Sequence, residues 1–186
     1  MSEIKYDAFI SYSHSEPDAY VAEKLHTMLE HYHISKKLQK ISEKKKIERV
    51  FRDREELPLS SDLAANIRKA LENSEFLIVV CSPRAVRSKW VQREIETFLE
   101  THEKDKVLTL LTEGEPEEVF PEVLCYNDEV VLRENGEKEV VRKKVEPMAA
   151  DIRGRTRKET EKKLKEEFLR ILAPMLSCTY DTLRQR

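Results

Sequence analysis

The sequence predicts an α/β domain in which a parallel β-sheet is covered by helices on both faces. Short apolar segments alternate along the chain with amphipathic helical patterns, in the order strand, helix, strand, helix, strand, helix, strand. One of these segments, residues 76–80, reads Phe-Leu-Ile-Val-Val without a polar interruption, which is typical of a central strand buried on both faces. Strands that alternate with helices in this way form parallel sheets with right-handed crossovers.

The first half of the chain supplies two expected strands and two expected helices. Residues 6–11 form the first strand, and residues 17–33 form a helix whose apolar side chains recur every three or four positions, with Pro17 near its start. A brief strand is expected at residues 48–52, followed by a polar loop. Ser60 or Ser61 then caps a helix that runs to Glu72. The lysine-rich stretch 36–46 is expected to be a solvated loop.

The second half continues the alternation and then departs from it. After the strand at 76–80 come a helix containing residues 88–100 and a strand at 106–112. Residues near 128–143 are expected to be a β-hairpin insertion around a type I′ turn at Asn135-Gly136. A last short strand is expected within residues 148–153, and a helix over 156–172 that Pro174 ends or kinks.

Composition excludes several classes of function. A formal net charge of -2 offers no general attraction for nucleic acid, and no apolar run reaches the length of a membrane span. With only three glycines, neither the dinucleotide motif GxGxxG nor the phosphate loop GxxxxGK[ST] can be written. The three cysteines lack CxxC spacing, so neither a zinc module nor a disulfide framework is expected, and a cytoplasmic location is the default. No metal site is expected.

Ligand sites in such sheets lie beyond the carboxyl ends of the strands. Four segments are expected there: residues 11–14, 53–61, 81–83 and the loop that starts at Thr112. His14 and Asp53 are candidates within them, although His14 is as well explained as a loop residue and Asp53 as a brace for its own loop.

The helix that includes Ser88-Lys-Trp-Val-Gln-Arg-Glu-Ile carries three glutamates in different settings. On a helical wheel Glu94 lies beside Trp90 on the shoulder of the buried arc, whereas Glu96 and Glu100 point towards solvent. A carboxylate shielded beside an aromatic ring is suited to meet a ligand. A structural ion pair between Glu94 and Arg87 or Arg93 is the alternative, and helical periodicity alone favours it.

Three segments together resemble the Toll/interleukin-1 receptor (TIR) domain, bacterial branch. They are YDAFISYSH at 6–14, VFRDREELP at 50–58 and SKWVQREI at 88–95, in the order and spacing of that family's three boxes. The resemblance implies a flavodoxin-like sheet with strand order 2-1-3-4-5. It implies a TIR domain over residues 4–176, with residues 177–186 starting a helix or linker to further domains.

The resemblance also implies an activity. Many bacterial TIR domains cleave NAD+ at the nicotinamide–ribose bond and serve antiphage defence. By that resemblance Glu94 is the catalytic carboxylate, Trp90, Ser13, His14 and Asp53 contact the substrate, and no cofactor is needed because NAD+ is itself the substrate. Self-association with other TIR domains is expected. The product, ADP-ribose or a cyclic form, stays open.

Three features depart from the family pattern. Ser13-His14 stand where basic residues sometimes follow the first box, which weakens the assignment of these two residues as phosphate contacts. The loop after the second strand has Leu59-Ser60 where a glycine is common, and the hairpin around Asn135-Gly136 has no counterpart in that pattern. The competing interpretation is a non-catalytic module that assembles with other TIR domains, and the Trp90/Glu94 pair favours the enzyme.

Overall fold

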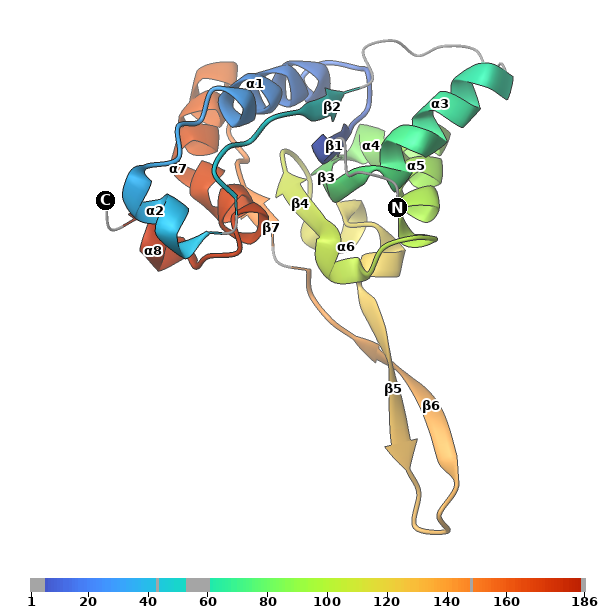
Figure 1. The fold of residues 1–186 in the computed structure, drawn as a ribbon. Coiled ribbons are helices and arrows are strands. Elements are labelled where there is room, and N and C mark those ends of the chain that lie inside the picture. The colour runs from blue at the N-terminus through green and yellow to red at the C-terminus, as the bar shows by residue number, and fades with distance from the viewer. Residues whose placement is uncertain (1–5, 43, 53–60, 148, 185–186) are drawn as a thin grey trace.

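The computed structural model describes residues 6–42, 44–52, 61–147 and 149–184, with the backbone alone at 61–64. Its centre is a five-stranded parallel sheet in the order β2-β1-β3-β4-β7. This order confirms the flavodoxin-like prediction, because β7 is the fifth strand of the sheet and the hairpin strands β5 and β6 interrupt the numbering (Figure 1). The sheet strands are β1 (Tyr6–Ser11), β2 (Val50–Arg52), β3 (Ser74–Cys81), β4 (Val107–Leu111) and β7 (Ala149–Asp151).

Helices cover both faces of this sheet (Figure 1). The α-helices are α1 (Asp18–Glu30), α2 (Lys36–Ile41), α3 (Ser61–Glu72), α4 (Pro83–Arg87), α5 (Lys89–Leu99), α6 (Pro116–Val119), α7 (Arg157–Met175) and α8 (Tyr180–Arg184), and short 3₁₀ turns occupy η1 (Lys104–Lys106) and η2 (Glu122–Leu124). The helix expected at 88–100 is α5. Helix α4 precedes it as a separate turn, because Ser82 caps α4 and Ser88 caps α5.

Alternation along the strands divides the core into two layers. In β3, Phe76, Ile78 and Val80 face one side, where they pack with α1, α7 and α8. Leu77, Val79 and Cys81 face the other side, against α3, α4, α5 and α6. Burial on both faces explains why this strand reads as an unbroken apolar run. The buried Cys81 thiol is a core group, and burial raises its pKa far above the ordinary value.

The lysine-rich stretch is not the solvated loop that its composition predicts. Residues 36–41 form helix α2, which Ser35 caps and whose Leu38 is buried in the α1 layer. Lys44 lies 2.6 Å from Asp7 Oδ1 and also pairs with Glu75. Composition alone misses this arrangement, because the acidic partners come from β1 and β3, far away in the sequence.

Two expected features, the end of the last long helix and the turn of the hairpin, differ in the structure. Helix α7 continues through Pro174 to Met175, so the proline lies in its last turn rather than ending it. The hairpin β5 (Tyr126–Leu132) and β6 (Lys138–Lys144) is present, but its turn is not type I′. Gly136 has φ +85°, Asn135 is not among the described residues with positive φ, and the Arg133 amide donates to the Glu137 carbonyl. These contacts close a three-residue loop that ends in a left-handed glycine.

The hairpin stands away from the body of the domain as an arm (Figure 1). Its base is closed by a hydrogen bond of 2.7 Å from the Val145 amide to the Cys125 carbonyl. The five-stranded sheet does not include it, and β5 and β6 form a two-stranded sheet of their own.

Candidate active site

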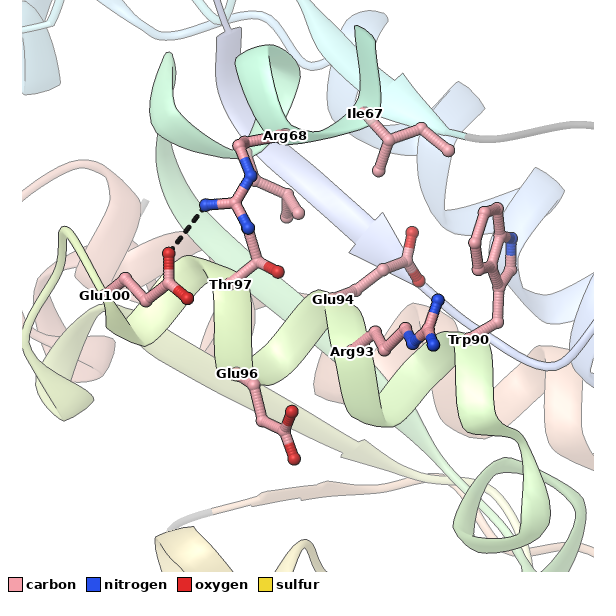
Figure 2. Close-up of a pocket in the computed structure, with 9 residues that line it drawn as sticks. Ile67, Arg68, Trp90, Arg93, Glu94, Glu96, Thr97 and Glu100 are labelled. Atoms are coloured by element: carbon pink, nitrogen blue, oxygen red, sulfur yellow. Dashed lines mark hydrogen bonds and ion pairs between the residues drawn. The ribbon is translucent and has the colours of Figure 1, made fainter. Parts of the chain in front are cut away.

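A pocket of about 310 Å³ lies between helices α3 and α5 (Figure 2). Helix α3 contributes apolar side chains and one arginine, while α5 contributes the tryptophan and the acids. The described residues that line the pocket are Ile67, Arg68, Leu71, Trp90, Arg93, Glu94, Glu96, Thr97 and Glu100. Trp90 and Glu94, which the sequence pairs on one shoulder of the helix, both line it.

Glu94 is far more deeply buried than a helical shoulder position implies. Its exposed fraction is 4%, and its Oε1 accepts a hydrogen bond of 2.7 Å from Ser11 Oγ. Ser11 is the last residue of β1 and is fully buried. The carboxylate therefore lies at the carboxyl end of a central strand, where parallel sheets place their ligand sites. Because a buried charge is costly unless it is hydrogen-bonded, the Ser11 hydroxyl stabilises the Glu94 carboxylate in this position.

Trp90 lies one helical turn before Glu94 and forms the neighbouring wall of the pocket (Figure 2). The ring is partly buried against the α3–α5 layer. Its indole Nε1 is shielded from solvent and, within the described part of the chain, donates to no acceptor. The face of Trp90 that lines the pocket, and not the shielded NH, is therefore the part of the side chain that a ligand can contact.

The other acids of α5 are solvated, as the wheel predicts. Glu96 and Glu100 are exposed, and Glu100 pairs with Arg68 of α3 at 2.7 Å across the pocket (Figure 2). Arg87 and Arg93, the partners that the structural alternative for Glu94 names, are both exposed.

The remaining predicted contacts are only partly gathered at the site. Ser13 and His14 follow Ser11 at the end of β1 but do not line the pocket. Ser13 is buried and its Oγ accepts from the Ser15 amide at 3.3 Å, while His14 stacks on Tyr12 with ring centroids 4.7 Å apart. Asp53 lies outside the described residues.

The sequence places two polar groups near the site within the expected segments but does not show their contacts. Ser11 belongs to the expected segment 11–14, and nothing in its local pattern shows that it faces a helix 83 positions later. The second group joins three loops at the same edge of the sheet: Asp18, fully buried, accepts hydrogen bonds from Ser82 and from Arg84 at 3.0 Å. Arg84 also pairs with Glu113. Burial raises the pKa of Asp18, and its hydrogen bonds to Ser82 and Arg84 offset part of that effect.

The parallel sheet in the order β2-β1-β3-β4-β7 is the arrangement that the resemblance to TIR domains implies. The sequence profile of the TIR domain matches residues 8–139, and the chain belongs to that family.

The chain is similar to two known proteins. The chain is 37% identical over 115 residues to the NAD(+) hydrolase ApTIR of an Actinoplanes species, a match that covers 60% of this chain and 15% of that protein. Among solved structures, the TIR domains of the activated Roq1 resistosome, which directly recognises the pathogen effector XopQ, share 24% identity with a TM-score of 0.42, over 61% of each chain. Among the described residues, no helix has the length and apolar character to cross a membrane.

Proposed function

We propose that this domain cleaves NAD+ at the bond between nicotinamide and ribose, with Glu94 as the catalytic carboxylate. The observation that carries the proposal is the buried Glu94 carboxylate, held by Ser11 beside Trp90 in a pocket. The similarity to a protein named as an NAD(+) hydrolase supports the same reaction, and that relative is about seven times longer than the matched segment.

The chemistry needs one negative charge at a fixed position. When the bond breaks, nicotinamide leaves as a neutral molecule and the C1′ carbon of the ribose acquires oxocarbenium character. A carboxylate about 4 Å away, at an effective dielectric constant of about 20, stabilises one positive charge by ~4 kcal/mol. That energy corresponds to about three orders of magnitude in rate. Glu94 supplies this charge, and Trp90 offers its ring face to the substrate.

The second half of the reaction is the capture of the ribosyl centre. Attack by water forms the C1′–O bond, loses a proton and gives ADP-ribose, whereas attack by an adenine nitrogen closes a ring and gives a cyclic product. The pocket volume of about 310 Å³ is at the lower end for ligand sites, which suits the nicotinamide-riboside end of the substrate. The adenosine end then extends to the edge of the sheet that carries Ser13 and His14, with Asp53 as the remaining proposed contact.

We propose that the reaction acts in bacterial antiphage defence inside the cell, through association with other TIR domains. The alternative is a TIR module that only assembles and has no turnover. The pocket that Glu94 and Trp90 line, together with the similarity to an NAD(+) hydrolase, favours the enzyme.

The decisive experiment measures nicotinamide release by liquid chromatography from NAD+ and the purified chain at high protein concentration. Glu94→Gln preserves the shape of the side chain and removes its charge, and we expect about a thousandfold loss of kcat. Glu72→Gln, an exposed acid of α3 outside the pocket lining, is the matched control and should keep full activity.

The outcomes separate the two functions. Equal turnover by the Glu94 variant removes Glu94 from the mechanism. No turnover by the unaltered chain, even at high concentration, leaves the assembly module as the function. Chromatography of the nucleotide product distinguishes ADP-ribose from a cyclic form.

A further inference from the structure

The β5–β6 arm exposes apolar side chains that the domain leaves uncovered. Most large apolar residues exposed in the described part of the chain lie on this arm. Their exposed fractions are Val130 66%, Val131 42%, Leu132 69%, Val140 66% and Val141 40%. Single exposed apolar residues are ordinary on protein surfaces, but a contiguous group marks an interaction site.

The strand register divides these residues between the two faces of the arm. Val130 is paired directly with Val140, and Leu132 lies two positions along the same strand from Val130. Since side chains alternate along a strand, these three residues share one face, here called the open face. Val131 and Val141 lie on the opposite face and are less exposed.

The arm lacks a hydrophobic core of its own. A two-stranded ribbon is at best marginally stable in water unless a third strand or another layer covers it. The ion pairs on the arm, Arg133–Glu139 and Lys143–Glu129, are largely exposed, and such pairs contribute little. The open face therefore requires a covering layer for the arm to hold its shape.

We propose that a second copy of this chain covers the open face, so that two arms pack face to face in a symmetric dimer. The charges on the strands fit this occupant. On the open face, strand β5 carries Asp128, whereas β6 carries three basic residues, Lys138, Arg142 and Lys144. A two-fold axis along the arm places β5 of each copy over β6 of the other.

In this arrangement each cross-strand pair of one copy lies over the same pair of the other copy, with the two residues exchanged. Val130 of one copy lies over Val140 of the other, and Leu132 lies over the aliphatic part of Lys138, because these residues are paired in the register of each arm. Asp128 lies over Arg142 in the same way, which joins opposite charges twice in the dimer. A two-fold axis across the arm at the Val130–Val140 pair would instead stack β6 on β6 and place Lys138 of one copy over Arg142 of the other, with like charges together.

The size of the contact sets its strength. Seven-residue strands give an arm roughly 23 Å long and two strands wide. Two such faces bury roughly 1,000 Å² in total, the range of weak and transient interfaces. The dimer is therefore concentration-dependent, with a dissociation constant in the micromolar range. The proposal is independent of NAD+ cleavage, because no arm residue lines the α3–α5 pocket.

Sedimentation equilibrium or light scattering on the full chain tests the proposal over a wide concentration range. The mass should rise from that of the 21.9 kDa monomer towards twice this value. Replacing Val130 and Val140 by threonine keeps β-branched residues and weakens the open face, so the midpoint concentration should rise at least tenfold. The matched control replaces Val131 and Val141 by threonine and should change the midpoint less than threefold.

A second variant does not depend on the arm's own folding. Tyr126 and Lys144 are cross-strand partners, so an Asn-Gly link can join them in place of residues 127–143. This variant should remain monomeric at every concentration while its thermal unfolding stays cooperative. Three results would overturn the proposal: a monomeric unaltered chain, equal association of the armless variant, or equal loss in both threonine variants. A monomeric unaltered chain would assign the open face to a different protein.

Discussion

The hydrogen bond from Ser11 to Glu94 predicts a measurable cost for Ser11→Ala. The serine is fully buried and its Oγ lies 2.7 Å from Glu94 Oε1, so alanine leaves a buried carboxylate oxygen without this donor. Hydrogen bonds to charged groups contribute about 1.5–3 kcal/mol. We expect the free energy of unfolding to fall by about 2 kcal/mol, which lowers the Tm by about 4–8 °C in a domain of this size.

The same change should slow NAD+ cleavage, because the carboxylate loses the contact that orients it. We expect kcat to fall about tenfold, equivalent to ~1.4 kcal/mol, with little change in KM, since Ser11 does not line the pocket. Urea unfolding and the rate of nicotinamide release at saturating NAD+ measure the two effects.

Ser74→Ala is the matched control for this prediction. Ser74 is equally buried, but its hydroxyl donates to the neutral Ala70 carbonyl at 2.6 Å, at the opposite end of the sheet. We expect a loss of about 1 kcal/mol in stability and full activity. If Ser11→Ala costs no more stability than Ser74→Ala and leaves kcat unchanged, the bond does not hold the acid and the reasoning fails.

Three further predictions concern charge, binding and backbone. Arg84→Met removes a partner of buried Asp18 and should cost about 3 kcal/mol of stability at pH 7. Because burial raises the pKa of Asp18, the stability that this residue contributes is complete below about pH 4 and is lost as the pH rises through its folded pKa. Urea unfolding should therefore show a smaller cost of Arg84→Met at pH 4 than at pH 7, and no such pH effect in an Asp18→Asn background. Trp90→Ala should raise KM for NAD+ about tenfold, measured by initial rates, and a change in kcat alone would contradict a binding role. Gly136→Ala places a side chain at φ +85° in open space, so hydrogen exchange of the arm should quicken by roughly fivefold, equivalent to about 1 kcal/mol, while the Tm of the body stays constant.

Periodicity predicts the long elements of this fold well, because their local pattern and their burial agree. The run at Phe76–Val80 is apolar on both faces and is buried on both faces in the sheet. The lysine-rich stretch fails for the opposite reason. Its helix depends on one apolar residue, Leu38, and on acidic partners from distant strands, and neither dominates the composition.

The sequence predicts the helix that carries the candidate site and the segment 11–14 at the same edge of the sheet, but not the contact between them. A wheel places Glu94 beside Trp90, but it cannot show that the carboxylate is 4% exposed, since burial depends on the position of α5 over the end of β1. The contact of Ser11 with Glu94 could not be predicted for the same reason, because its partner lies in another element. The turn type of the hairpin could not be predicted even from its local sequence. Asn135-Gly136 suits a type I′ turn, but the three-residue loop uses only the glycine at positive φ.

The α3–α5 pocket lies on one side of the central sheet, and helices α1 and α7 pack on the other side. Every described residue that lines the α3–α5 pocket comes from α3, α5 or the end of α5, whereas the α1 and α7 side contributes none. Replacements that improve packing beneath α1 and α7 can therefore raise the melting temperature without reshaping the pocket. Substitutions on the α1 and α7 side are therefore suited to raising thermal stability, and substitutions on the pocket side are suited to altering substrate preference.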